Sequence, residues 1–164
     1  MVEIYRTQQR QLAPAEQIEE GCWICMTAPN LEEITRVAAT LDIEPSDLQA
    51  ALDPEESARI TLEDGYTVII VDIPCKEQET SEGVYTTIPM GILLTQEVVV
   101  TVCAQATPVL TDFSTGRVRD FSTRKKMRFI YQILYRAATM YQQELRLIDR
   151  RRQGIETNLS GALR

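Results

Sequence analysis

The chain ends in TRKKMRFIYQILYRAATMYQQELRLIDRRRQGIETNLSGALR, residues 123–164. Apolar residues recur in this segment at separations of mostly three and four, which places them in one stripe along a helix. The stripe consists of Met127, Ile130, Leu134, Ala137, Tyr141, Leu145, Ile148, Ile155 and Leu159. The segment contains no proline, and its two glycines lie near its far end. The pattern predicts one uninterrupted helix, capped at its start by residues 121–123.

This helix is too long for the domain that precedes it. At ~1.5 Å of rise per residue it extends roughly 60 Å, whereas a domain of ~120 residues has a radius of gyration of only ~13–14 Å. The helix must therefore project beyond its own globule. Its apolar stripe then lacks a complete partner within the chain, and we expect something outside the chain to cover it.

Composition limits the function classes. The 164 residues are 44% hydrophobic and 25% charged, which is typical of one globular domain with a real core plus the helix. A net charge of −7 disfavours nucleic-acid binding, because phosphates repel an acidic surface. The absence of histidine removes the usual general base and disfavours an enzyme. No signal peptide is recognisable, and no apolar run reaches the ~18–20 residues that span a bilayer, so we expect the chain as given to be soluble.

The four cysteines are Cys22, Cys25, Cys75 and Cys103. The C-x-x-C spacing of the first two permits a redox or metal site, but a redox pair needs its first cysteine at a helix N-terminus. The neighbouring residues 23, 24 and 26 are instead typical of a strand, in which residues three apart point to opposite faces. We therefore favour small buried cysteines in a sheet, and from them a reducing, cytosolic setting.

The remaining pattern predicts an α/β/α sandwich around a mixed, mainly antiparallel sheet over residues 1–122, followed by the start of the long stalk helix at 123–164. Asn30 and Glu33 match a capping box, and the helix that they start has an apolar face made by Leu31, Ile34, Val37, Ala38 and Leu41. Strands are expected over 2–7, part of 8–20, 23–27, 58–62, 66–73, 85–94 and 98–103, and helices over 30–41, 46–52 and 108–116.

Two of these segments carry more detailed predictions. Residues 66–73 are almost continuously apolar, which predicts a central strand covered on both faces. Residues 77–83 are polar and acidic, which predicts a mobile surface loop.

A family resemblance follows from the order and spacing of several short pieces. These pieces are Trp23, Pro29-Asn30 with Glu33, Leu52-Asp53 leading to Arg59-Ile60, Pro89-Met90-Gly91-Ile92-Leu93-Leu94, Val98-Val99-Val100-Thr101-Val102, and Thr123-Arg124-Lys125-Lys126 followed by Tyr141 and Glu156. Together they cover nearly the whole chain. In that order the chain resembles the amino-terminal cytosolic domain of CorA-type divalent-metal transporters.

The resemblance implies an α/β sandwich followed by a very long stalk helix. In the family the stalk leads to two membrane helices, and five chains form a funnel around a pore for hydrated magnesium. Neither the membrane helices nor the family's Gly-Met-Asn signature is present here. The resemblance implies a cytosolic regulatory or gating domain of a CorA-like transporter, truncated before its membrane helices, not an enzyme, at the cytoplasmic face of the membrane. We expect a homopentamer in the full-length parent and a monomer or weak oligomer for this fragment.

The family's regulatory metal sites do not transfer to this sequence. Their carboxylates would fall at Gln49 and Ala50 and near Arg136 or Ala137, none of which is acidic. We therefore assign no catalytic, cofactor-binding or metal-binding residue; no cofactor is required, and magnesium is expected only as a transported or weakly bound ion. The acidic clusters at 53–56 and 63–64 are best explained as a solvated cap and a turn, with a weak hydrated-magnesium site as the alternative.

Basic clusters at 117–128 and Arg150-Arg151-Arg152 have two interpretations. They can be solvated, or they can meet acidic surfaces of neighbouring subunits or line the funnel. Three tyrosines, Tyr131, Tyr135 and Tyr141, are expected to pack where the long helix joins the globule.

Two other function classes remain. One is a stand-alone α/β ligand-sensing or oligomerisation module, which a reading frame continuing into two apolar segments of ~20 residues would exclude. The other is a small enzyme that uses carboxylates or the Cys22/Cys25 pair, which thiol titration would test.

Overall fold

A computed structural model describes residues 1–76 and 85–162 of the chain. In chain order the elements are β1 (Val2–Gln8), β2 (Gln11–Pro14), β3 (Cys22–Thr27), α1 (Leu31–Leu41), α2 (Pro45–Ala50), β4 (Arg59–Leu62), β5 (Tyr66–Lys76), β6 (Tyr85–Thr95), β7 (Val99–Cys103), α3 (Pro108–Ser114) and α4 (Lys126–Ala162). The loop predicted over residues 77–83 lies outside the described residues.

The strands form one seven-stranded sheet in the order β2-β1-β3-β7-β6-β5-β4. Only β3 and β7 pair in parallel; the other neighbouring pairs are antiparallel, which confirms the mixed, mainly antiparallel sheet. The central strand is β7, all five of whose residues are buried. The prediction that 66–73 is central is wrong, because β5 is second from the edge and β4 pairs with its outer side. Apolar residues on both faces of a strand indicate that both faces are buried, but they do not indicate the position of the strand in the sheet.

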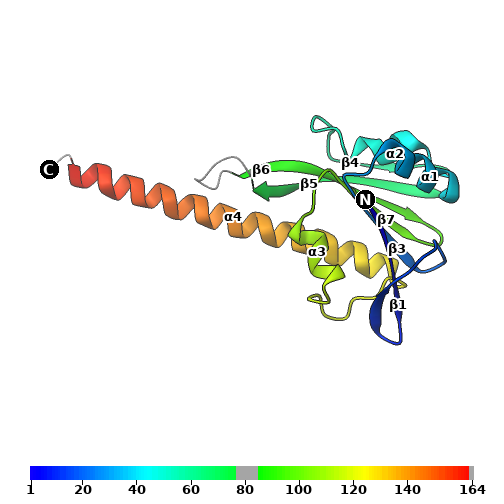
Figure 1. The fold of residues 1–164 in the computed structure, drawn as a ribbon. Coiled ribbons are helices and arrows are strands. Elements are labelled where there is room, and N and C mark those ends of the chain that lie inside the picture. Colours follow the sequence, from blue (N-terminus) through cyan, green and yellow to red (C-terminus); the bar gives the residue numbers. More distant parts are fainter. Residues whose placement is uncertain (77–84, 163–164) are drawn as a thin grey trace.

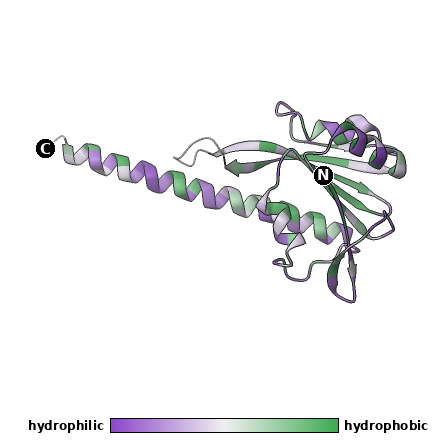
Figure 2. Cartoon of the chain, in the orientation of Figure 1, coloured by the Kyte–Doolittle hydropathy of each residue, from purple (hydrophilic) through white to green (hydrophobic). Residues whose placement is uncertain are grey.

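Helices cover both faces of this sheet (Figure 1), which confirms the α/β/α sandwich. The core under α1 and α2 includes Ile24, Ile34, Leu48 and Val100. The core under α3 and α4 includes residues from the opposite side of the same strands and is rich in aromatic side chains. Figure 2 shows hydrophobic residues concentrated in the middle of the sheet and in the part of α4 beside it.

The start of α1 forms as the sequence predicts. Asn30 Oδ1 accepts from the Glu33 amide at 2.8 Å, and Glu33 Oε2 accepts from the Asn30 amide at 3.0 Å. Ile34, Val37 and Ala38 are buried against the sheet, but Leu31 is 68% exposed. The prediction for Leu31 is wrong because it is the first residue of the helix, at the margin of the apolar face.

The long helix α4 runs without interruption to Ala162 and projects past the end of the sheet (Figure 1). It begins at Lys126, three residues later than predicted, and the Thr123 hydroxyl oxygen accepts from the Thr7 amide. The division into residues 1–122 and 123–164 stays a prediction, although buried residues of α4 such as Phe129 and Ile133 belong to the core of the sandwich. Among residues 1–76 and 85–162, no helix combines the length and apolar character needed to cross a bilayer.

Candidate functional site

An aromatic cluster holds the first turns of α4 against the sheet. Trp23 of β3 is fully buried, and its ring lies 5.1–6.3 Å, between centroids, from those of Tyr5, Phe113, Phe121 and Phe129. The three phenylalanines are 4.7–5.0 Å from one another. Such pairs contribute about 0.5–1.5 kcal/mol each beyond the burial of their area. The cluster joins β3, α3 and α4 into one rigid unit.

Polar contacts fix the same helix at both ends of its packed part. The Thr7 amide donates to Thr123 Oγ1 at 2.9 Å and the Thr123 amide donates to Thr7 Oγ1 at 3.0 Å, so two buried threonines 116 residues apart bind each other's backbone. Further along, the Tyr141 hydroxyl donates to the carbonyl oxygen of Asp72 on β5 at 2.8 Å. Between them, Arg136 forms an ion pair with Asp112 of α3.

Beyond Tyr141 the apolar stripe of α4 is uncovered. Ile130 and Ala137 are buried as predicted, whereas Leu145, Ile148, Ile155 and Leu159 are 55–62% exposed. Figure 2 shows hydrophobic and hydrophilic segments alternating along the projecting part of α4. The unsatisfied stripe predicted from the sequence is therefore present.

The predicted stripe was wrong in its first turn. Met127 is 60% exposed, while Phe129 and Ile133, which the prediction omitted, are fully buried. Ile133 lies three residues after Ile130 and four before Ala137, so the helical spacing could have found it.

The expected packing of three tyrosines at the junction is right only for Tyr141. Tyr131 and Tyr135 are 73% and 75% exposed. Each directly follows an apolar stripe residue, Ile130 or Leu134, and a step of one residue rotates the side chain by ~100° towards solvent.

The cysteines behave as buried side chains of the sheet. Cys22 belongs to the core under α1 and α2, and Cys25 to the core under α3 and α4, which confirms that their sulfurs diverge. Burial raises the pKa of the Cys25 thiol to about 11 and raises that of Cys103. The C-x-x-C pair lacks the geometry of a redox motif, because its two side chains belong to cores on opposite faces of the sheet and neither lies at a helix N-terminus. No disulfide joins cysteines within residues 1–76 and 85–162.

The acidic clusters make local contacts. Asp53 Oδ1 accepts from the Glu55 amide at 3.0 Å, and Glu56 pairs with Arg59 at 3.2 Å. Within the described ranges, no group of three or more His, Cys, Asp or Glu side chains is placed to hold a metal ion. The assignment of no metal site stays a prediction. Because the matching carboxylates are absent, we also predict that magnesium changes the stability of the chain little. A shift of many degrees in the melting temperature at millimolar magnesium, without an equal effect of ionic strength, would contradict this.

A basic groove lies at the opposite end of α4 from its free tip. It has a volume of about 1570 Å³ and is bounded by the β1–β2 hairpin, the end of α3, residues 115–125 and the first turn of α4. Five cationic side chains line it: Arg6, Arg10, Arg124, Lys125 and Arg128. The sequence marked the last three as part of the 117–128 cluster. It gave no sign of Arg6 and Arg10, which the hairpin brings to the same groove.

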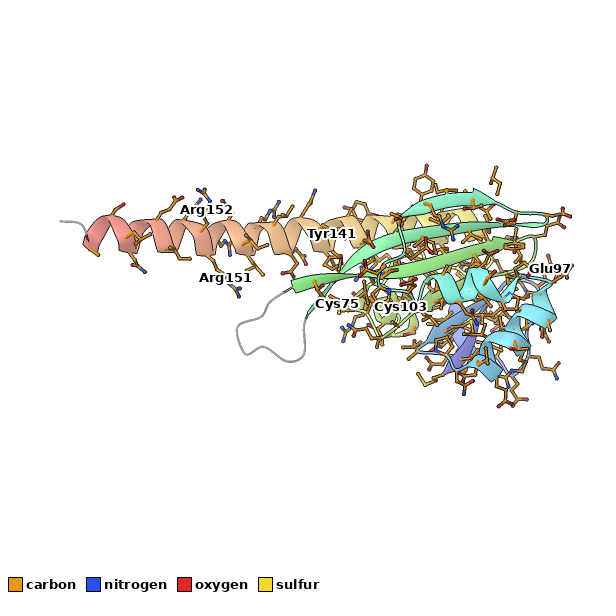
Figure 3. The ribbon with its side chains drawn as sticks, turned by 90° about the horizontal axis from the view of Figure 1, so that it is seen from above. Cys75, Glu97, Cys103, Tyr141, Arg151 and Arg152 are labelled. Atoms are coloured by element: carbon orange, nitrogen blue, oxygen red, sulfur yellow. The ribbon has the colours of Figure 1, made fainter. Side chains whose placement is uncertain are left out.

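Charge is divided unevenly along the chain. Residues 1–104 contain 19 acidic and 5 basic residues, whereas residues 105–164 contain 5 acidic and 12 basic ones. The overall charge of −7 therefore conceals a strongly basic carboxyl-terminal part. Figure 3 places two of these basic residues, Arg151 and Arg152, on the projecting part of α4, beyond the Tyr141 contact.

Comparison with known proteins gives one family. The model of the family described as CorA-like Mg2+ transporter protein matches residues 19–163. The chain is also similar in structure to the complete CorA magnesium transporter from Methanocaldococcus jannaschii, with a TM-score of 0.79 and 20% identity over 97% of this chain and 51% of that one. No curated protein matches the chain.

Two soluble domains show the same likeness. The soluble domain of the same CorA gives a TM-score of 0.80 and 20% identity over 97% of this chain and 64% of that one. The ZntB cytoplasmic domain from Vibrio parahaemolyticus gives a TM-score of 0.70 and 13% identity over 90% of this chain and 62% of that one. The chain thus spans about half the length of the complete transporter that it matches. Because the family model covers most of its length, the chain belongs to the CorA-like Mg2+ transporter family.

Proposed function

We propose that this chain is the regulatory, gating domain of a CorA-like divalent-cation transporter, acting at the cytoplasmic face of the membrane as one subunit of a homopentamer. Magnesium is the cation that the family's description favours. The α/β/α sandwich is the body of the domain, and α4 is the element through which it contacts the rest of the assembly.

The observation that carries this proposal is the contrast between the two parts of α4. Up to Tyr141 the helix is held by buried aromatic rings, an ion pair and hydrogen bonds. From Leu145 onward its apolar stripe lies in water. An exposed apolar face of this kind marks an interaction surface, and a helix anchored so firmly at one end conveys the orientation of its body to whatever binds the other.

Transport by the full-length protein in liposomes tests this role. We expect magnesium uptake to fall as internal magnesium rises, and we expect removal of this domain to abolish that inhibition while uptake persists. Inhibition of equal strength without the domain would contradict the proposal.

A point variant tests the role of the helix. Ile148→Asp/Ile155→Asp places charges on the exposed stripe and should alter the inhibition. Arg146→Gln/Arg150→Gln, on the same segment but on the opposite side of the helix from Ile148, makes an equal change of net charge and should leave inhibition unchanged.

A further inference from the structure

The basic groove is a preformed concavity between two segments far apart in sequence. The reciprocal hydrogen bonds between Thr7 and Thr123 hold the β1–β2 hairpin against the segment that leads into α4. The Arg124 side chain lies over Gly21, with its Cγ 3.1 Å from where a Cβ would stand at that glycine. The groove walls are therefore fixed by buried contacts before any ligand arrives.

Four of the five cations of this groove lack acidic partners among the described residues. Arg6 pairs with Glu19, but the other four make no ion pair within residues 1–76 and 85–162. Asp120 is the one acidic residue among the described residues that line the groove. In a chain with 24 acidic residues, this leaves a concentrated positive field in a concave site. Guanidinium groups bind phosphate oxygens in a bidentate manner, which suits a ligand with several phosphates.

A second hollow continues from the groove along α4. It has a volume of about 440 Å³ and shares Val118 and Arg128 with the groove. Its wall includes the exposed rings of Tyr131 and Tyr135. Aromatic side chains next to arginines form stacking surfaces for a planar base.

We propose that the two hollows together form a binding site for a nucleoside polyphosphate. The phosphates lie in the groove on Arg10, Arg124, Lys125 and Arg128, and the base lies on the tyrosine side. The groove is larger than the ~300–1,000 Å³ typical of small-molecule pockets, so it has room for an extended triphosphate. This proposal does not depend on the transport role, because nucleotide binding can be measured on the 164-residue chain without any measurement of transport.

Isothermal titration of the full chain with ATP tests the site. Inorganic triphosphate, adenosine and sulfate are titrated at the same ionic strength. We expect ATP to bind more tightly than triphosphate, and sulfate and adenosine to bind weakly. Absence of ATP binding above the level of sulfate would overturn the proposal, and equal affinity for ATP and triphosphate would overturn its base-binding half.

Two matched double variants locate the binding. Lys125→Gln/Arg128→Gln removes two exposed cations that make no ion pair, so the fold should persist, and it should weaken ATP binding roughly tenfold or more, since charge-assisted contacts are worth at least that factor. Arg150→Gln/Arg151→Gln makes the same change of charge on the projecting part of α4 and should leave affinity unchanged. An equal loss in both variants would reduce the effect to general electrostatics and overturn the site.

A third variant tests the stacking surface. Tyr131→Ala/Tyr135→Ala should lower the affinity for ATP and leave that for triphosphate unchanged. If ATP does not bind but the chain self-associates in a salt-sensitive manner that Lys125→Gln/Arg128→Gln abolishes, the groove belongs to the acidic surface of a second copy and the proposal fails.

Discussion

At the scale of single residues, Tyr66 of β5 links the sheet to the helical layer that contains α2. Its hydroxyl donates to Asp47 Oδ2 at 2.6 Å and accepts from the Glu44 amide at 3.2 Å, which ties the start of α2 to β5. Burial, reinforced by the hydrogen bond to the Asp47 carboxylate, raises the pKa of Tyr66 to about 12. The residue is therefore a protonated donor throughout the neutral range.

The shifted pKa predicts a loss of stability in alkali. Because the phenol has an unfolded pKa of 10.0 and a folded pKa of about 12, the folded state holds the proton more tightly. The protonated phenol contributes its full stabilisation to the folded state below the unfolded pKa, and this stabilisation is lost as the pH rises through the folded pKa. Burial raises the pKa of Tyr5 to about 12, with Glu3 adding to the shift, and so this tyrosine acts in the same sense.

Urea unfolding at a series of pH values checks this. Tyr66→Phe should cost about 1 kcal/mol at neutral pH and should flatten the fall of the unfolding free energy between about pH 10 and 12. A fall as steep as in the wild type would show that the hydroxyl is not the titrating group.

At the scale of elements, α2 sits on β6 through a contact that leaves no room for a side chain. A Cβ built on Gly91 would lie 2.8 Å from Ala51 Cβ, immediately after α2. Gly91 lies opposite Ile70 on one neighbouring strand and Val102 on the other, both buried in the core under α1 and α2. The glycine thus sets how closely the helical layer approaches the sheet.

Two glycine-to-alanine substitutions should have opposite effects. Gly91→Ala should destabilise the fold by about 1–3 kcal/mol, because the added methyl forces α2 outward. Gly154→Ala lies in α4 with nothing within 4 Å of the new Cβ and should stabilise the helix by up to ~1 kcal/mol. Thermal and urea unfolding measure both, and a neutral Gly91→Ala would mean that the contact is loose.

The elements could largely be predicted from sequence because their causes are local. The capping box at Asn30, the turn before Tyr66 and the long periodic helix each depend on residues a few positions apart. The Thr7–Thr123 and Tyr66–Asp47 contacts could not be predicted, since they join residues that only the tertiary fold brings together. For the same reason two of the five cations of the basic groove could not be predicted, because Arg6 and Arg10 reach it through a hairpin at the other end of the chain.

At the scale of the whole molecule, an acidic body carries a basic helical part with an uncovered apolar stripe. The four apolar side chains of the stripe beyond Tyr141 are all more than half exposed, and Leu147 beside them is 41% exposed. The area that they offer is narrow, because a single helix presents only one stripe. Such a surface strengthens the association of copies that other contacts already hold together. On its own it gives only weak association.

The chain alone should therefore be a monomer or a weak oligomer in solution. Sedimentation at micromolar concentration is the measurement. Any association should weaken in Ile148→Asp/Ile155→Asp and persist in Arg146→Gln/Arg150→Gln, whose changes lie on the opposite side of the helix. A tight pentamer that is insensitive to salt would contradict this prediction.

The reciprocal hydrogen bonds between Thr7 and Thr123 fix the chain just before α4 and define a point about which the helix can pivot. From there the helix extends roughly 55 Å, with the Tyr141 contact less than halfway along. A sideways shift of about 1 Å at Tyr141 is magnified more than twofold at Ala162 by simple leverage. A small change in the contact between Tyr141 and β5 thus becomes a larger displacement at Ala162, which distance measurements between spin labels would detect.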